Sequence, residues 1–331
     1  MIISVIRAGS VNLKKIARKI NPEENIKVNY RRLNRFFQKF EFDKKVMAKL
    51  LSSFLPDEKW VIILDRTNWK FGKKHINILM LAVAYKGMAI PILWTILPKK
   101  RKNGNSNFRD RIRIMKRFID IFGIDRIEVL VADREFIGEV WFRWLKKRNI
   151  PFVTRIKEGH KVKIGKNEKK VKTLFSSLMK QQHEFYQTKI TIYGYEYLSL
   201  IAIKLKNEYF ILATNINQEK ALGFYKRRWE IETLFSAYKI RGFNLETTHM
   251  SENKKLDSLI AILSLAFVWC HTVGEWLNEK KPIKTLKHGR KEKSFFLFGF
   301  EYLDEIFSHY DVRGRELDKA VKLFDVGKFE K

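Results

Sequence analysis

The sequence WVIILD, residues 60–65, joins a run of apolar, largely β-branched residues to a carboxylate at its end. Such a run predicts a buried strand whose last side chain lies at the edge of a sheet, where loops and ligands meet. A second run of the same kind, IEVLVAD at residues 127–133, also ends in an aspartate. Because aspartate is common in ordinary turns as well, neither Asp65 nor Asp133 defines a site by itself.

The segments around these two runs predict a particular order of elements. His75–Tyr85 and Met88–Leu97 predict two strands joined as an antiparallel hairpin, and Pro91 places the second of them at a sheet edge. A helix, the strand ending in Asp133, a helix and a strand are expected at 108–122, 127–133, 135–149 and 150–156. This is the order of a ribonuclease H-like fold, in which the first and fourth strands are neighbours. Asp65 and Asp133 are therefore expected to meet.

The segment Leu222–Lys239, LGFYKRRWEIETLFSAYK, predicts one continuous helix, since no Pro or Gly follows Gly223. At 100° per residue, four polar side chains share a stripe about 60° wide: Tyr225, Arg228, Glu232 and Lys239. An adjoining apolar stripe would dock the helix on a core: Phe224, Ile231, Phe235 and Tyr238. The alternative is an ordinary surface helix with an i,i+4 ion pair, which is common and weak.

The spacing Tyr-x2-Arg-x3-Glu-x6-Lys resembles, residue for residue, the Tyr-Arg-Glu-Lys motif of DDE transposases of the insertion sequence 4 family. The likeness extends from about Asp65 to Phe307. It implies that Asp65, Asp133 and Glu232 are catalytic and hold two Mg²⁺ ions, for which Mn²⁺ can substitute. It also implies nicking at a DNA end, attack of the freed 3′-hydroxyl to give a hairpin, hairpin opening and strand transfer.

The resemblance assigns further residues to DNA binding. Tyr225, Arg228 and Lys239 are expected to hold the phosphates of the distorted DNA end, and arginine binds phosphate strongly in a bidentate manner. Arg66, directly after the first aspartate, is expected to line the same site. Glu135 lies two residues past Asp133 and is expected to support the ligands rather than to bind metal.

The chain divides into five predicted parts. A basic, helical N-terminal DNA-binding region is expected first, with Arg31, Arg32 and Arg35 interleaved among phenylalanines; a solvated amphipathic helix is the alternative. A mixed α/β domain of ribonuclease H-like type with helices on both faces follows, interrupted by a β-rich insertion and ending in a helical C-terminal region. The boundaries are 1–59, 60–156, 157–216, 217–250 and 251–331.

The insertion carries its own expectations. Tyr193, Tyr195 and Tyr197 alternate along a predicted strand and would share one face, either as a DNA-stacking surface or as a solvated sheet face. Insertions at this position in the family are expected to carry a tryptophan that stacks on a displaced base. Residues 157–216 contain no tryptophan, so the resemblance leaves that role to a Phe or Tyr, if it is kept.

The composition indicates a polyanionic partner. Lys and Arg number 67 against 36 Asp and Glu, the net charge is +31 and the pI is near 10, which favours nucleic acid or an anionic membrane surface. The longest apolar segment, Leu259–Cys270, is shorter than the ~20 residues that span a bilayer, so a buried helix and no membrane are expected. A single cysteine, Cys270, excludes an internal disulfide and indicates a reducing compartment.

Three readings of the function therefore remain. A transposase would act on double-stranded DNA, namely element terminal inverted repeats and target DNA, as a homodimer on paired ends in the cytoplasm, associated with the nucleoid. A catalytically inactive DNA-binding remnant would have lost a carboxylate, and Asp65, Asp133 and Glu232 are all present. A ribonuclease H-like nuclease would share these carboxylates, but this interpretation does not explain the polar stripe or the basic N-terminal region.

Overall fold

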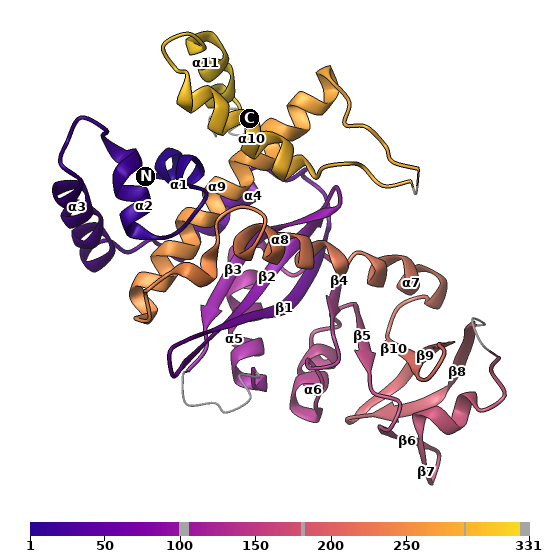
Figure 1. The fold of residues 1–331 in the computed structure, drawn as a ribbon. Coiled ribbons are helices and arrows are strands. Elements are labelled where there is room, and N and C mark those ends of the chain that lie inside the picture. The colour runs from indigo at the N-terminus through magenta and orange to yellow at the C-terminus, as the bar shows by residue number, and fades with distance from the viewer. Residues whose placement is uncertain (99–105, 180–182, 288, 325–331) are drawn as a thin grey trace.

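The computed structural model describes residues 1–98, 106–179, 183–287 and 289–324, with only the backbone described for residues 183–189. Within these ranges, one ten-stranded sheet of order β3-β2-β1-β4-β5-β10-β9-β8-β6-β7 runs through the molecule (Figure 1). The strands are β1 Trp60–Phe71, β2 Lys74–Tyr85, β3 Met88–Ile96, β4 Ile127–Ala132, β5 Phe152–Ile156, β6 Lys161–Ile164, β7 Asn167–Lys170, β8 His183–Ile192, β9 Tyr195–Lys204 and β10 Tyr209–Thr214.

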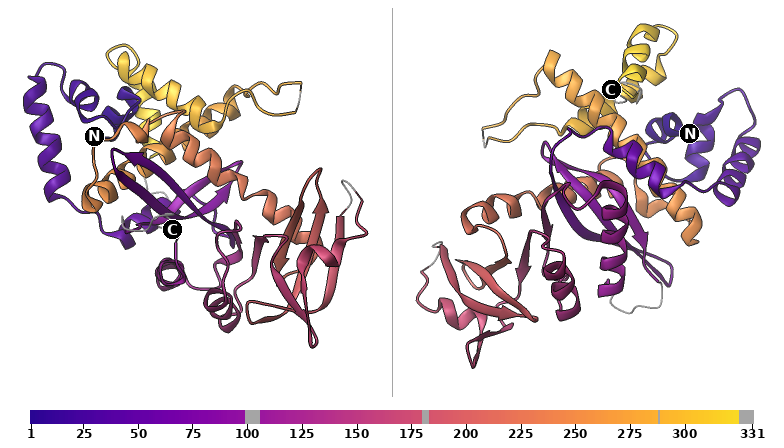
Figure 2. Two further views of the ribbon diagram at one scale, coloured as in Figure 1. Left: turned by 60° about the horizontal axis from the view of Figure 1, so that its bottom comes forward. Right: turned by 180° about the vertical axis from the view of Figure 1, so that it is seen from behind.

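Helices cover both faces of the first half of the sheet and extend from it. They are α1 Ile2–Ala8, α2 Leu13–Ile20, α3 Ile26–Lys39, α4 Lys44–Ser52, α5 Phe108–Phe122, α6 Glu139–Lys147, α7 Gln218–Lys226, α8 Trp229–Lys239, α9 Asn253–Lys280, α10 Phe295–Ser308 and α11 Gly314–Lys322, with 3₁₀ turns η1 Val171–Phe175 and η2 Leu245–Thr247. Helix α8 packs on β1–β3 from one face and α5 from the other (Figures 1 and 2). Helices α1–α3 lie on one side of the molecule and β6–β10 on the other.

The expected ribonuclease H-like sheet is confirmed. β1, β2 and β3 are antiparallel neighbours, β4 lies parallel beside β1, and β5 lies parallel beside β4. The predicted end of the first strand at Asp65 is wrong, because β1 continues to Phe71 while pairing with β2. The parallel pairing with β4 does end there, at Leu64 opposite Ala132. Asp65 and Asp133 are therefore the next residues on two adjacent strand paths.

The β-rich segment 157–216 extends the same sheet. β10 pairs antiparallel with β5, from Ile211 opposite Ile156 to Thr214 opposite Val153. The expectation that three tyrosines share a strand face is wrong. Tyr193 lies in the turn between β8 and β9 with φ of +51°, Tyr195 is buried, and Tyr197 is 63% exposed with φ of +62°. The turn breaks the period-two alternation on which that expectation depended.

Helix α9 is the buried axis of the C-terminal region. It is long and apolar enough to cross a membrane by length and composition, and 89% of its most apolar stretch is buried within the structure. It is longer than the apolar run in the sequence because polar residues at both ends continue the helix. α10 crosses α9 at two glycines: a Cβ on Gly274 would lie 1.8 Å from the Phe295 carbonyl oxygen, and one on Gly299 would lie 1.8 Å from the Cys270 carbonyl oxygen.

Candidate active site

The first carboxylate of the site is a buried one. The side chain of Asp65 is 16% exposed, and its Oδ1 accepts a hydrogen bond from the Arg66 amide at 2.7 Å. The pKa of Asp65 is raised to about 7, chiefly by burial; the Arg66 amide and the Arg228 guanidinium lower it, and the nearby Glu135 and Asp133 carboxylates add to the rise. The ionised form of Asp65 is therefore costly here, and a cation beside it would stabilise that form.

The polar stripe lies across the point where β1 and β4 stop pairing, next to Asp65 and Asp133. The Tyr225 hydroxyl donates to Asp133 Oδ1 at 3.3 Å, and Arg228 Nη1 lies 3.3 Å from Asp65 Oδ2. Arg228 also forms an ion pair with Glu232 through its other terminal nitrogen. The structure thus brings Asp65 and Glu232 to the Arg228 guanidinium, and it joins Asp133 to Tyr225 of α7.

The single continuous helix expected over Leu222–Lys239 is wrong. α7 ends at Lys226 and α8 begins at Trp229. Between them, the amides of Arg227, Arg228, Glu230 and Ile231 donate to carbonyls three residues back, the pattern of a tightened 3₁₀ turn. No Pro or Gly marks this break. Tyr225 belongs to α7 and Glu232 to α8, so the stripe is assembled from two helices.

Lys239 lies farther along β1. Its Nζ donates to the Asn68 carbonyl at 2.6 Å and lies 3.1 Å from Glu246. Asn68 follows Asp65 by three residues, which is roughly 10 Å along a strand at about 3.3 Å per residue. Lys239 is thus separated from the carboxylates, and it is placed beside any ligand that follows β1 away from them.

The donor set has the chemistry of a divalent-cation site. Asp65, Asp133 and Glu232 offer only carboxylate oxygens, which hard divalent ions prefer. In the described ranges, no three His, Cys, Asp or Glu side chains are placed to hold a metal ion. The Arg228 guanidinium instead stands between Asp65 and Glu232. The residues fit such an ion once the Arg228 guanidinium moves away. Asp65 and Glu232 then lose their cationic partner, and a divalent ion can take its place between them.

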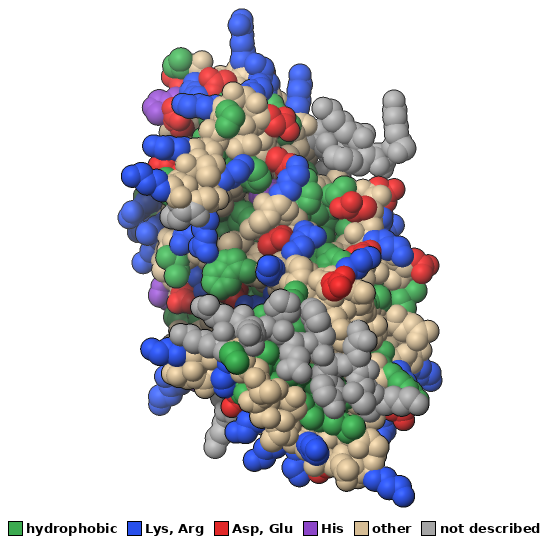
Figure 3. Space-filling model, turned by 90° about the vertical axis from the view of Figure 1, so that its right-hand side faces the viewer, with side chains coloured by type: hydrophobic (Ala, Val, Ile, Leu, Met, Phe, Trp, Pro, Cys, Tyr) green, Lys and Arg blue, Asp and Glu red, His purple; other side chains and the backbone are tan. Residues whose placement is uncertain are grey.

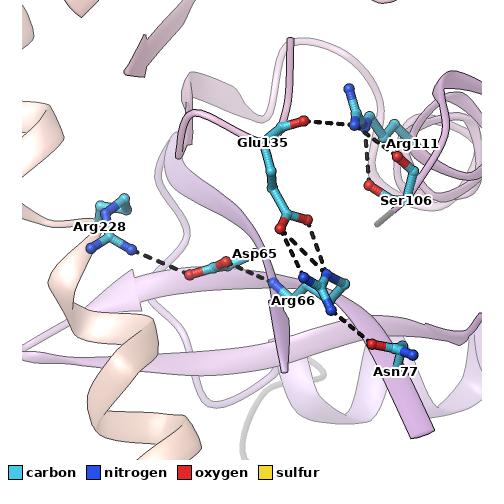
Figure 4. Close-up of polar contacts among 7 residues, drawn as sticks. All are labelled: Asp65, Arg66, Asn77, Ser106, Arg111, Glu135 and Arg228. Atoms are coloured by element: carbon cyan, nitrogen blue, oxygen red, sulfur yellow. Dashed lines mark hydrogen bonds and ion pairs between the residues drawn. The ribbon is translucent and has the colours of Figure 1, made fainter. Parts of the chain in front are cut away.

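A second ionic network lies on the far side of Asp65 (Figure 4). Arg66 donates to Glu135 through Nε at 3.2 Å and through Nη2 at 3.1 Å, and its Nη1 donates to Asn77 Oδ1 at 2.7 Å. Arg66, expected to line the DNA site, is 13% exposed and engaged in this network. Glu135 accepts a bidentate contact from Arg66 and so supports the loop after Asp133.

Arg111 of α5 is a site-supporting residue that sequence reasoning missed. It is 5% exposed and donates to Ser106 Oγ at 3.0 Å and to the carbonyls of Ser106 and Glu135 at 2.8 and 2.7 Å (Figure 4). It also donates to the Ile137 carbonyl at 2.9 Å. Burial lowers the pKa of Arg111 to about 10, against the opposing effect of Glu135 and Asp110. Its position three, four and seven residues before Ile114, Met115 and Phe118, on the apolar face of the helix, is the signal that could have found it.

Replacing Arg111 by Met is expected to lower the free energy of unfolding by about 2–4 kcal/mol, because three buried or partly buried carbonyls lose their only described side-chain donor. Urea unfolding measures this directly. Arg113→Met is the matched control, since Arg113 lies on the exposed side of the same helix, and its effect should stay within about 0.5 kcal/mol. Equal effects of the two substitutions would contradict the supporting role of Arg111.

The basic N-terminal residues lie away from the carboxylates. Arg31, Arg32 and Arg35 are exposed on α3, and Arg32 forms an ion pair with Glu24. Figure 1 shows α3 and α7 on opposite sides of the β1–β3 hairpins. On the face drawn in Figure 3, Lys and Arg side chains lie both at the edges and across the middle, with Asp and Glu among them.

Two aspartates that directly follow the last parallel pair of β1 and β4, and a glutamate on a helix packed across the sheet, are the arrangement expected of a DDE transposase. The transposase DDE domain family matches residues 56–269 of the sequence. The chain therefore belongs to this family, whose members use divalent metal ions. Its fold is similar to that of piggyBac transposase in a cryo-EM structure of the synaptic complex with hairpin DNA, with 13% identity, a TM-score of 0.46, and coverage of 95% of this chain and 71% of that one. No curated protein matches the sequence.

Proposed function

We propose that this chain is a DNA transposase of the insertion sequence 4 type, in which Asp65, Asp133 and Glu232 are the metal-binding catalytic carboxylates. The observation that carries the proposal is the convergence of Asp65 and Glu232 on Arg228, with Asp133 held by Tyr225. Family membership supports the same reading. The reaction would be cleavage and strand transfer at DNA ends, through a hairpin intermediate.

Two Mg²⁺ ions, or Mn²⁺ in their place, would supply Lewis-acid activation of the phosphodiester and of the attacking and leaving oxygens. Arg228 neutralises Asp65 and Glu232 in the DNA-free protein, and on DNA binding its guanidinium would turn to a phosphate of the substrate. Tyr225 keeps Asp133 oriented through its hydroxyl. Lys239 would contact the DNA backbone farther along β1.

The proposed partner is double-stranded DNA, both as the terminal inverted repeats of the element and as the target. We propose that a homodimer assembles on paired ends, in the cytoplasm and associated with the nucleoid. The net charge of +31 supports a polyanionic partner. A strong dependence of affinity on salt is expected, because each neutralised phosphate releases counterions.

The proposal is tested by cleavage of a labelled duplex carrying the DNA that flanks this gene. Wild-type protein and Asp65→Asn are compared with Mg²⁺, with Mn²⁺ and with a chelator. The expected result is nicks and hairpins that require the metal and are absent with Asp65→Asn. Tight, salt-sensitive binding without cleavage by the wild type would favour an inactive DNA-binding remnant. Cleavage without hairpins or strand transfer would favour a simple nuclease.

Arg228→Ala is expected to slow hairpin formation about 10- to 100-fold, because a charge-assisted contact to the bent DNA end contributes about 1.5–3 kcal/mol. First-strand nicking, which needs less distortion, should fall by much less. Single-turnover assays on intact and pre-nicked duplexes separate the two steps. Arg227→Ala is the control, since Arg227 faces the Ala84 carbonyl and Glu230 instead. Equal losses in both steps would contradict this role of Arg228.

A further inference from the structure

A cavity of about 460 Å³ lies between the N-terminal helices and the segment that links α8 to α9. Its volume is within the range of small-molecule sites, about 300–1,000 Å³. Phe37 and Met250 are buried lining residues and make part of it apolar, while the rings of Tyr30 and His249 provide aromatic walls. The cavity thus combines flat, apolar surfaces with polar groups, and none of its lining residues belongs to the carboxylate site.

Two asparagine side chains that line this cavity each use one end of the amide within the protein, which leaves a donor on one and an acceptor on the other. Asn12 caps α2, and its Oδ1 accepts from the amides of Lys14 and Lys15 at 3.0 and 3.3 Å, so its amino group remains as a donor. Asn34 donates through Nδ2 to the Tyr30 carbonyl at 3.0 Å, so its Oδ1 remains as an acceptor. One donor and one acceptor beside aromatic rings match the edge and faces of a nucleobase.

Cationic side chains stand among the lining residues. Lys14 is exposed, and Lys255 pairs with Glu252 at 2.7 Å. The neighbouring helices α2 and α3 carry further exposed cations, among them Lys15 and Arg31. A nucleotide bound in the cavity would therefore have its phosphate close to positive charge. These cations favour a nucleotide over an uncharged heterocycle, which has no phosphate for them to bind.

The cavity is joined to the carboxylate site by β1. Past Asp65 this strand continues to Phe71, whose ring packs against that of His249 at 5.4 Å between centroids. Six residues of strand span about 20 Å at about 3.3 Å per residue, which is roughly six nucleotides of a duplex strand at 3.4 Å each. Lys239, bound to the Asn68 carbonyl, lies between the two ends of this path.

We infer that the cavity receives one unpaired nucleotide of the DNA, about six nucleotides from the phosphate that is cut. The inference rests on the proposed function for its substrate. The base lies between the rings of Tyr30 and His249, and its edge accepts from the Asn12 amide and donates to Asn34. Extruding a base from a duplex costs a few kcal/mol and least at weak pairs, so the cavity selects DNA ends that open at this position.

The test places 2-aminopurine singly at each position of the terminal 15 or so base pairs of the flanking duplex and measures its fluorescence on binding. The protein is the full chain with Asp65→Asn, in a chelator, so that no cleavage is needed. The expected result is a fluorescence rise at one position only. Asn34→Ala should remove this rise and weaken binding about fivefold, the loss of one neutral hydrogen bond. Its cost in stability is small, because the Tyr30 carbonyl belongs to the same helix.

Asn12→Asp is the second variant. Aspartate caps a helix as well as asparagine does, so the fold is kept while the donor becomes an acceptor, and the rise should again be lost. Asn25→Asp is the matched control: Asn25 caps α3 through a 2.9 Å bond from the Lys27 amide, and it does not line the cavity. This control makes the same change of charge and should retain the signal.

Several outcomes would overturn the inference. One is the absence of any fluorescence change along the duplex, and another is an equal change in Asn12→Asp, Asn34→Ala and the control. Saturable binding of free dAMP or dGMP that Asn34→Ala removes, with no signal from DNA, would assign the cavity to a soluble nucleotide instead. Metal-dependent cleavage by the wild type without any signal would reject the cavity while leaving the proposed function in place.

Discussion

Glu232→Gln is expected to lower DNA strand cleavage on the order of 10³-fold or more, while DNA affinity changes by less than about twofold. A metal-binding carboxylate contributes several kcal/mol to the transition state, and each 1.36 kcal/mol is tenfold in rate. Glutamine has the same shape but lacks the charge that holds Arg228 now and that would hold a metal during the reaction. Single-turnover cleavage and a binding titration in the same buffer measure the two effects.

Glu230→Gln is the matched control for this experiment. Glu230 lies on the same helix, two residues earlier, and its side chain is 13% exposed against 34% for Glu232, but it pairs with Arg227 at 3.0 Å. Burial raises the pKa of Glu230, while its contacts with Arg227 and with the amides of Tyr85 and Gly87 lower it. Cleavage by Glu230→Gln should remain close to the wild-type rate. Wild-type cleavage by Glu232→Gln would refute the assignment of three catalytic carboxylates.

Gly299→Ala is expected to destabilise the fold by about 3 kcal/mol or more, because a methyl group there meets the backbone of α9 and not a flexible side chain. Its Cβ would lie 1.8 Å from the Cys270 carbonyl oxygen and 2.6 Å from the Gly274 nitrogen. Overpacking of a core typically costs 1–3 kcal/mol even where side chains can yield. Gly274→Ala should behave alike, and urea unfolding measures both.

The control for the glycine substitutions is Gly223→Ala in α7. A Cβ at Gly223 meets nothing within 4 Å, and its backbone φ is not positive. Alanine is favoured over glycine in a helix by about 0.8–1 kcal/mol, so this variant should be slightly more stable than the wild type. A neutral effect of Gly299→Ala would show that α10 does not sit on α9 as closely as described.

The order of strands and the nearness of Asp65 to Asp133 were predictable from the sequence, because buried parallel strands show as unbroken apolar runs. The true end of β1 was not, since residues after Asp65 pair only with β2, and the buried Thr67 and Trp69 alternate there with polar, exposed residues instead of forming an apolar run. The break between α7 and α8 was hidden for a related reason. It lies at Arg227 and Arg228, residues with good helix propensity, and tertiary contacts to Ala84 and Asp65 hold the tightened turn.

The supporting network was beyond the reach of motif reasoning. Arg111 and Glu135 come from different elements, and their roles depend on where the α5 helix meets the loop after β4. A basic helix normally turns its arginines to solvent, and no motif distinguishes Arg111 from the other arginines of α5. The position of Arg228 between Asp65 and Glu232 likewise follows from three-dimensional packing, because the i,i+4 spacing predicts only its pairing with Glu232.

The continuity of the sheet from β5 to β10 has a consequence for the nucleic acid. Residues 157–216 do not form a body on a linker, since turning them against the β1–β4 end would break the four backbone pairings between Val153–Ile156 and Ile211–Thr214. The protein surface is therefore rigid across this junction, and bound DNA would have to bend in order to follow it. Flexible pyrimidine–purine steps bend at lower cost. Ends with such steps should be preferred even where no side chain reads their bases.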